Sequence, residues 1–361
     1  MKILLITDLY PISLYPDKTI PSVIENFALG LKKIGCEIKV LRPNFIFNSL
    51  IRGHKIIKNG EYYSRGIVVI NKNFFLPFLN NDVSYLKDKF DVIISHMPSG
   101  HIYSRLINKK LNLPHIVVLH QSDWEVINNP FYKFYFRKLL KDAIKNSTYK
   151  FARNKFLKEE FNAQKILPSF TEKENILEYK EFQTGKIKFI TLSKFIKRKN
   201  INLVIEALSK VDFDFRYDIF GEGSEKNNLQ KLINKLNLSN KIKIHPFIPH
   251  KNINFMLDKS DVFILPSIKE TFGISYIEAM ARGLVVVGCK NTGIDGIIKD
   301  GVNGFLTEPN ANNIVDTLYR IKNSSKEEIS NNAIETVKEL TEEKVISEYF
   351  NEIKKTVELY I

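Results

Sequence analysis

The stretch that most constrains the fold runs from residue 260 to residue 283 and reads SDVFILPSIKETFGISYIEAMARG. It begins with an apolar run of strand length, residues 262–265, and breaks at Pro266. From Gly273 onward the apolar residues return at helical spacing, and Gly283 marks the end of that helix. The pattern predicts a strand, a loop and a helix in immediate succession, which is the repeating unit of a doubly wound α/β domain.

The start of this helix is suited to bind an anion. A helix leaves its first backbone N–H groups without internal partners, and its macrodipole favours negative charge at that end. The residues concerned are Thr271, Phe272, Gly273 and Ile274. Glu270 precedes them and Glu278 follows eight positions later, and carboxylates accept hydrogen bonds from hydroxyls. A ligand with phosphate in the middle and polyhydroxylated groups at its ends fits this arrangement, and a nucleotide sugar is such a ligand.

Residues 270–283, with the preceding Leu-Pro-Ser, resemble the signature of two glutamates separated by seven residues in the retaining family 4 glycosyltransferases. The alternative is an amphipathic helix with a surface glutamate. The resemblance covers about the whole chain, and its specific motifs lie in the second half. It implies an α/β protein of the GT-B fold, with two doubly wound Rossmann-like domains facing each other across a cleft. It also implies no cofactor and no metal, since the nucleotide sugar is a co-substrate.

The chain of 361 residues is long enough for two α/β domains. Apolar runs of strand length in the first half end at Thr7, Leu41, Ser95 and Leu119. Histidine-bearing loops are expected after the last two, at residues 96–100 and 120–125, and residues 54–71 suggest a hairpin. A charged stretch without periodicity is the expected linker. We therefore expect an acceptor-side domain in residues 1–170, a linker in 171–186, a nucleotide-sugar domain in 187–340, and a last helix, 341–361, that by family analogy crosses back to the first domain.

The net charge of +14 is concentrated in the first half, where residues 1–180 hold 28 Lys and Arg against 16 Asp and Glu. This predicts an anionic partner, either a membrane surface, a nucleic acid or an acidic acceptor, although a lysine-rich composition bias explains it too. Residues 130–161 mix aromatic and basic side chains, which suits a membrane interface; the alternative is a helix and a strand with a solvated basic face. No nucleic-acid motif accompanies them, so no nucleic-acid partner is expected.

The opening apolar run is too short for a signal peptide, and no stretch reaches transmembrane length. The two cysteines, Cys36 and Cys289, lie far apart without metal-ligand spacing and are expected to be core thiols in a reducing compartment. We therefore expect a cytoplasmic protein, with peripheral contact to the inner face of the plasma membrane through the basic first half.

A second phosphate-binding loop is predicted at residues 193–200, SKFIKRKN, between an apolar strand and a helix over residues 201–208. Four cations at such a junction favour an anion. The resemblance implies that Lys194 and Lys199 contact the donor diphosphate, whereas Lys197 and Arg198 are expected to be only solvated. It also places Gly221 in a glycine turn and Ile248 in a loop that holds the nucleobase through backbone atoms. A further strand is predicted over residues 242–245. Because Lys226 stands where a dinucleotide fingerprint has its third glycine, NAD binding is not predicted.

His120, directly after an apolar strand, resembles the family's histidine beside the donor sugar, and a purely structural histidine is the alternative. Asp123 is expected to orient it or to bind acceptor, and His96 to line the cleft. Lys18 and Thr19 stand where many relatives have a Gly-Gly loop, so we expect them on the acceptor side. Thr292 with Gly293, and Gly296, replace a common Gly-Gly and glutamate, which leaves the diphosphate and sugar contacts there open.

The resemblance implies transfer of a sugar from a nucleotide sugar, a UDP-sugar in the first instance, with retention of anomeric configuration. The acceptor is expected to be a saccharide or a lipid-linked saccharide in bacterial surface polysaccharide or glycolipid assembly. Glu270 would position the sugar hydroxyls and Glu278 the ribose, while Lys194 and Lys199 would stabilise the leaving diphosphate. The alternatives are a noncatalytic nucleotide-sugar-binding protein, a nucleotide-sugar epimerase, and a glycoside hydrolase with paired carboxylates, which needs no lysine-rich loop.

Overall fold

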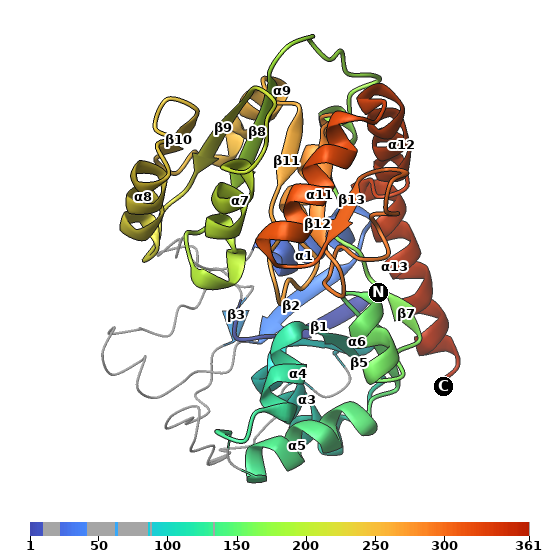
Figure 1. Ribbon diagram of the computed structural model, residues 1–361. Coiled ribbons are helices and arrows are strands. Elements are labelled where there is room, and N and C mark those ends of the chain that lie inside the picture. Colours follow the sequence, from blue (N-terminus) through green and yellow to red (C-terminus); the bar gives the residue numbers. More distant parts are fainter. Residues whose placement is uncertain (10–21, 42–61, 64–85, 87–88, 133, 361) are drawn as a thin grey trace. The chain divides into compact units, whose positions relative to one another are not determined.

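The computed structural model describes residues 1–361 except 10–21, 42–61, 64–85, 87–88, 133 and 361 (Figure 1). The chain divides into two compact units. Unit 1 contains Met1–Arg153, Leu157–Leu167 and Ile346–Ile361, and unit 2 contains Asn154–Phe156 and Pro168–Val345. Lys18, Thr19 and the predicted hairpin at residues 54–71, apart from Tyr62–Tyr63, lie outside the described residues.

Unit 1 is built on a parallel sheet with the strand order β3-β2-β1-β4-β5-β6-β7. The order reverses between β1 and β4, so the sheet is doubly wound. Every residue of β4 and β5 is buried, because helices cover both faces of such a sheet. The strands are β1 (Lys2–Ile6), β2 (Glu37–Leu41), β3 (Tyr62–Tyr63), β4 (Val92–His96), β5 (His115–Leu119), β6 (Tyr149–Ala152) and β7 (Lys165–Ile166).

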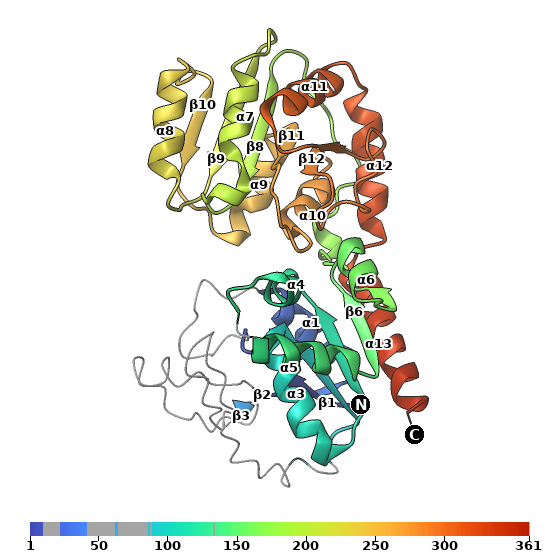
Figure 2. The same ribbon diagram turned by 60° about the horizontal axis from the view of Figure 1, so that its bottom comes forward.

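The helices of this half include α3 and α5, which pack side by side (Figure 2). The last helix, α13, contributes Tyr349, which is buried with edge-to-face ring contacts to Phe27 and Phe151 at 5.6 and 4.9 Å between centroids. The helices are α1 (Ser22–Lys33), α3 (Met97–Leu111), α4 (Gln121–Asn128), α5 (Phe134–Lys145), α6 (Lys155–Glu160) and α13 (Glu342–Glu358).

The loops that the sequence suggested after the strands ending near residues 95 and 119 are helices instead. Helix α3 begins at Met97 and α4 begins at Gln121, each directly after its strand. Pro98 occupies the first turn of α3, where a missing N–H costs nothing. Gly100 is there because a Cβ at that position would lie 2.7 Å from the carbonyl oxygen of Ile6. The run Pro-Ser-Gly therefore lets α3 pack closely on β1 and does not form a loop.

Unit 2 is a second parallel, doubly wound sheet with the order β10-β9-β8-β11-β12-β13, which reverses between β8 and β11. Helices α7 and α11 pack together on one face, and α10 and α12 pack together on the other. The strands are β8 (Ile187–Leu192), β9 (Phe215–Phe220), β10 (Ile242–His245), β11 (Val262–Ile264), β12 (Val285–Cys289) and β13 (Phe305–Thr307).

The helical segments of unit 2 connect these strands, and the predicted helix over residues 201–208 is confirmed as α7 with the same bounds. The prediction of two doubly wound α/β domains is confirmed as well. The segments are the 3-10 turns η2 (Lys173–Asn175), η3 (Lys197–Lys199) and η4 (His250–Asn252), and the helices α7 (Ile201–Leu208), α8 (Lys226–Lys235), α9 (Ile253–Asp258), α10 (Ile274–Ala281), α11 (Ala311–Lys322) and α12 (Lys326–Lys338).

Among the helices that the structure describes, none combines the length and the apolar character that crossing a lipid bilayer requires.

Candidate functional site

The candidate site lies in unit 2 at the carboxyl ends of β8 and β11, the two neighbouring strands between which the strand order reverses. Ligands of open α/β sheets bind at this point because the loops after the two strands diverge there. The two loops, residues 193–200 and 265–273, are tied to each other. The N–H of Ile268 donates to the carbonyl of Arg198 at 2.9 Å, and the Asn200 amide donates to the carbonyl of Pro266 at 2.8 Å. They therefore form one structural element.

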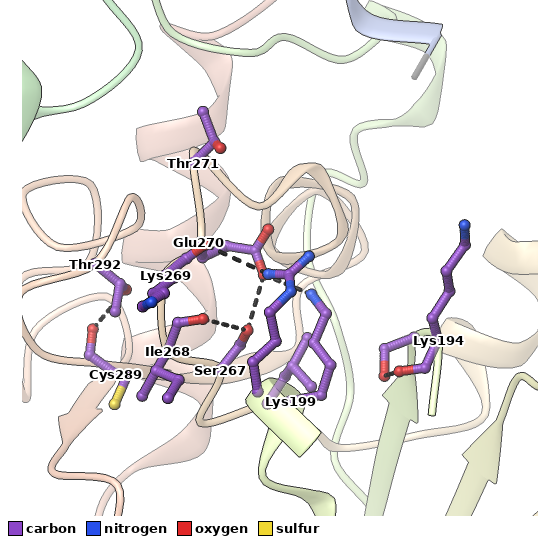
Figure 3. A network of polar contacts seen from close by, with 12 residues as sticks. Lys194, Lys199, Ser267, Ile268, Lys269, Glu270, Thr271, Cys289 and Thr292 are labelled. Carbon is purple, nitrogen blue, oxygen red and sulfur yellow. Dashed lines mark hydrogen bonds and ion pairs between the residues drawn. The ribbon is translucent and has the colours of Figure 1, made fainter. Parts of the chain in front are cut away.

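Lys199 and Glu270 form the centre of this site. Lys199 Nζ lies 2.5 Å from Glu270 Oε2, and the Ser267 hydroxyl donates to the same oxygen at 3.0 Å. The Lys199 and Glu270 side chains are only 12% and 15% exposed, so the ion pair is largely shielded from water. Figure 3 shows Lys199 and Ser267 pointing toward Glu270. The structure thus brings together the predicted phosphate-binding cation and the predicted sugar-binding carboxylate.

Lys194 is placed differently from Lys199, although both follow β8. Its side chain is exposed and points away from the Lys199–Glu270 pair (Figure 3). The Arg198 guanidinium lies 4.0 Å from Glu270 Oε2 and donates to the carbonyl of Lys269 at 3.3 Å. Arg198, which the sequence suggested to be merely solvated, therefore adds positive charge to the centre of the site.

Gly273 shapes the start of α10 as the sequence predicted. Its φ of 76° lies in the left-handed region, and a Cβ there would lie 2.5 Å from the ring of Tyr276. No oxygen in the described part of the chain accepts the N–H groups of Gly273 and Ile274. The helix therefore presents unpaired donors next to Glu270, which suits an anion. Gly283, with φ 70°, ends the helix as predicted.

Contacts to the backbone carbonyls of Glu270 and Thr271 fix the loop that carries these two residues. The N–H of Gly293 donates to the carbonyl of Glu270 at 2.9 Å, and a Cβ on Gly293 would lie 2.2 Å from the carbonyl oxygen of Thr271. The buried Asn154 amide donates to that same oxygen at 2.8 Å. The sequence reasoning missed Asn154, and the role of Gly293 is steric: only a glycine lets the two loops approach this closely.

Two positions where the chain departs from the family pattern have ordinary surroundings. The Thr292 hydroxyl donates to the carbonyl of Cys289 at 2.8 Å, within its own turn (Figure 3). Gly296 has a φ of 102°, and a Cβ at this position would have no atom within 4 Å, so it faces open space.

Gly221 and Ile248 complete the predicted donor-site residues. Gly221 has a φ of 149°, and a Cβ there would lie 1.9 Å from the carbonyl oxygen of Ser193. A Cβ on Gly223 would likewise collide with the backbone of Phe195. The Gly-x-Gly turn thus makes room for the loop after β8. Ile248 is half-buried in the loop between β10 and η4.

Glu278 has a partner that the sequence reasoning did not identify. The Nε2 atom of His250 lies 2.7 Å from Glu278 Oε1, and this hydrogen bond raises the pKa of His250 above its ordinary value. Glu278 is 14% exposed, whereas His250 is 81% exposed on η4. The signal for such a contact was slight, because a histidine after Phe-Ile-Pro is 28 residues away from the glutamate.

In unit 1, His96 and His120 form a pair. His96 Nδ1 and His120 Nε2 are 3.0 Å apart, and burial, followed by neighbouring positive charge, holds the pKa of both imidazoles well below the usual range. The backbone N–H of His120 donates to Asp123 Oδ2 at 2.7 Å. Asp123 is fully buried, so in this structure it holds the start of α4 in place and has no contact with solvent.

A second buried network lies beside this pair. The Ser95 hydroxyl is 2.8 Å from both His101 Nδ1 and His115 Nε2, and His101 Nε2 is 3.4 Å from Asp123 Oδ1. Since Ser95 has one proton, it donates to one ring and accepts from the other. His101 Nε2 and Asp123 Oδ1 face each other without forming a hydrogen bond. Burial lowers the pKa of His115 to about 3, so its ring is neutral.

The described residues contain no group of three or more His, Cys, Asp or Glu side chains arranged to hold a metal ion. Lys199 and Arg198 bring positive charge next to Glu270.

Comparisons with known proteins agree with this geometry. Residues 172–339 match the family model described as glycosyl transferases group 1. An uncharacterized glycosyltransferase of Methanocaldococcus jannaschii is 26% identical over 244 residues, which cover 65% of this chain and 66% of that protein. An amylovoran biosynthesis glycosyltransferase of Erwinia amylovora is 30% identical over 145 residues, 37% of this chain and 36% of that protein. The matched segments thus span less than two thirds of these relatives.

Among solved structures, HepE of Anabaena in complex with UDP superposes with a TM-score of 0.74 at 16% identity, over 98% of this chain and 99% of that one. At this identity the likeness establishes the fold. Residues 172–339 thus match the glycosyl transferases group 1 family, and the fold of the chain is GT-B.

Proposed function

We propose that the protein transfers a sugar from a nucleotide sugar, in the first instance a UDP-sugar, to a saccharide or lipid-linked acceptor during assembly of a bacterial surface polysaccharide or glycolipid. The observation that carries this proposal is the shielded Lys199–Glu270 pair beside the unpaired N–H groups of α10. It combines cationic and N–H donors for a diphosphate with an acceptor for sugar hydroxyls. The UDP bound to the Anabaena structure supports the choice of donor, and the amylovoran biosynthesis named for the Erwinia relative is consistent with a role in assembling a larger product.

In the proposed reaction the bond between the anomeric carbon and the diphosphate oxygen breaks, and a bond from that carbon to the acceptor oxygen forms on the same face. The leaving phosphate oxygen takes the proton of the acceptor hydroxyl, so configuration is retained and no metal is required. Lys199 and Lys194 stabilise the charge that grows on the diphosphate. Glu270, held by Ser267, accepts the sugar hydroxyls, and Glu278 accepts the ribose hydroxyls.

The unit 1 residues have roles that rest on the resemblance alone. His120 is proposed to lie beside the donor sugar, and Lys18, Thr19, His96 and Asp123 to serve the acceptor side. The lowered pKa values of His96 and His120 keep both rings neutral at neutral pH. His120 would therefore act through hydrogen bonding and not through a positive charge.

The test is calorimetric titration of the purified chain with UDP, GDP and ADP. We expect selective binding of one nucleotide, weakened about tenfold or more by Lys199→Ala and by Glu278→Ala, because a hydrogen bond to a charged group contributes about 1.5–3 kcal/mol. Lys197→Ala is the matched control, since Lys197 is an exposed lysine on the same 3-10 turn. If none of the nucleotides binds, the proposal is wrong.

Turnover is tested separately with radiolabelled nucleotide sugar. Release of UDP that depends on an added saccharide or lipid-linked acceptor supports the transferase. Binding without any turnover would identify a noncatalytic binding protein, and a changed sugar without an acceptor would identify an epimerase.

We also propose that unit 1 contacts an anionic membrane through α5. Phe134, Lys138, Lys141 and Lys145 follow one exposed stripe of this helix, and Phe131 next to it is 87% exposed. Aromatic side chains at one end and lysines along the helix suit a lipid interface. Sedimentation with vesicles containing anionic lipid is expected to bind the protein, and Phe134→Ser to weaken this binding. Equal binding to vesicles of neutral lipid would refute the proposal that the lysines of α5 attract anionic lipid.

A further inference from the structure

His250 connects two parts of unit 2 that both belong to the candidate site. It begins η4, directly after the loop that follows β10, and its imidazole reaches Glu278 on α10 at 2.7 Å. Its ring is 81% exposed, while the carboxylate that it contacts is 14% exposed. His250 therefore holds Glu278 from the solvent side.

The hydrogen bond occupies one of the two carboxylate oxygens. His250 bonds to Glu278 Oε1, and within the described part of the chain Oε2 has no hydrogen-bond partner. A carboxylate oxygen accepts more than one hydrogen bond, so Oε2 is left to accept from a ligand hydroxyl. No other described side chain holds this carboxylate in place.

We propose that His250 is a positioning residue of the donor site, which holds Glu278 so that its second oxygen faces the ribose hydroxyls of the nucleotide. The inference rests on the proposed function, since that function assigns the ribose to Glu278. A glutamate that is already anchored loses less rotamer freedom when the ligand binds. For one immobilised side chain this corresponds to an affinity difference of about twofold to tenfold.

Protonation of His250 strengthens the anchor. The charged groups that face its ring are Glu278 of α10 and Glu172 of the segment before η2, and both favour the protonated form. Lys251, the next residue of η4, is exposed. A doubly protonated ring always has a proton on Nε2 to donate to Oε1, whereas a neutral ring also populates the tautomer that lacks it. Nucleotide affinity is thus expected to be higher below the pKa of His250 than above it.

The experiment is calorimetric titration of UDP into the full chain and into His250→Ala and His250→Gln, at about pH 6 and about pH 8.5. The Gln amide nitrogen replaces Nε2–H as donor but does not titrate. We expect His250→Ala to bind UDP about twofold to tenfold more weakly, and His250→Gln to bind with little loss. The affinity ratio of the wild-type chain to the Gln variant should rise at low pH, and taking this ratio at each pH cancels the titration of UDP itself.

Two controls separate positioning from other effects. Lys251→Gln removes an exposed cation from the same turn and is expected to leave the affinity unchanged. With 2′-deoxy-UDP the loss caused by His250→Ala should shrink, because one of the hydroxyls that Glu278 accepts is absent. Since His250 is exposed, the Ala variant is expected to melt at the wild-type temperature.

Equal UDP affinity of the wild-type chain and His250→Ala at both pH values would overturn the inference. Tighter binding by His250→Ala would also overturn it, because it would show that His250 blocks Glu278. If the wild-type chain binds no nucleotide at all, the proposed function fails and the inference fails with it, whereas normal wild-type binding with an unchanged variant refutes the inference alone.

Discussion

The shielded Lys199–Glu270 ion pair predicts a large coupling between two side chains that lie 71 positions apart. At 2.5 Å the Coulomb attraction is about 7 kcal/mol for an effective dielectric constant of about 20, and desolvation of the two ions offsets most of it. Losing one partner costs about 0–1 kcal/mol in exposed pairs and about 3–5 kcal/mol in buried pairs. With 12% and 15% exposure we expect about 2 kcal/mol for either Glu270→Gln or Lys199→Met.

The double variant is expected to cost about 2 kcal/mol as well, because the pair is already broken in each single variant. Calorimetric melting of unit 2 should show each variant about 4–8 °C below the wild-type chain. The fluorescence of Trp124, the one tryptophan of the sequence, reports unit 1 separately. The matched control is Lys186 with Asp214, which are 56% and 62% exposed and 3.9 Å apart. In this control pair the stability losses of the two single variants are expected to add in the double variant. If the losses caused by Lys199→Met and Glu270→Gln also add, the reasoning is wrong.

Three further predictions follow from backbone clearance and buried imidazoles. Gly273→Ala should destabilise unit 2 by about 1–2 kcal/mol and abolish UDP binding in calorimetric titration, whereas Gly185→Ala, with positive φ but open space around it, should leave binding intact. Gly293→Ala should weaken UDP binding by displacing the backbone of Thr271, and unchanged affinity would contradict this. Unit 1 should lose stability as pH falls below about 6.5. In the unfolded chain a histidine takes up a proton in this range, whereas in the folded chain His115, with a pKa of about 3, stays neutral. Each buried histidine that stays neutral in the folded chain lowers the free energy of unfolding by up to about 1.4 kcal/mol per pH unit. Urea unfolding at about pH 7 and about pH 5, followed by Trp124 fluorescence, should show the loss, and equal midpoints would refute it.

The regular parts of the fold could be predicted because their apolar period is uninterrupted. Residues 201–208 and 242–245 have the predicted bounds as α7 and β10. The helix starts after β4 and β5 could not be predicted, because the reason for Gly100 is a carbonyl on another strand. Local sequence shows that a glycine is present but not what approaches it.

The same limit applies to the site. The sequence located Lys199, Glu270 and Gly273, since a cationic loop and a glycine at a helix start are local patterns. It could not show that Lys199 and Glu270 are bonded to each other, or that His250 holds Glu278, because these contacts depend on the order of the strands. Pairing between side chains from different loops is a property of the folded sheet.

The Ser95–His101–Asp123 arrangement has a consequence for chemical labelling of this protein. By proximity alone it resembles the nucleophile, base and acid of a serine hydrolase, but all three side chains are buried and the ring is reversed, with Nδ1 toward the serine and Nε2 toward the aspartate. A fluorophosphonate in solution has no path to the Ser95 oxygen while unit 1 is folded. Unfolding does not activate Ser95 either, because a serine hydroxyl without an adjacent base is a weak nucleophile, so this protein should stay unlabelled in both states.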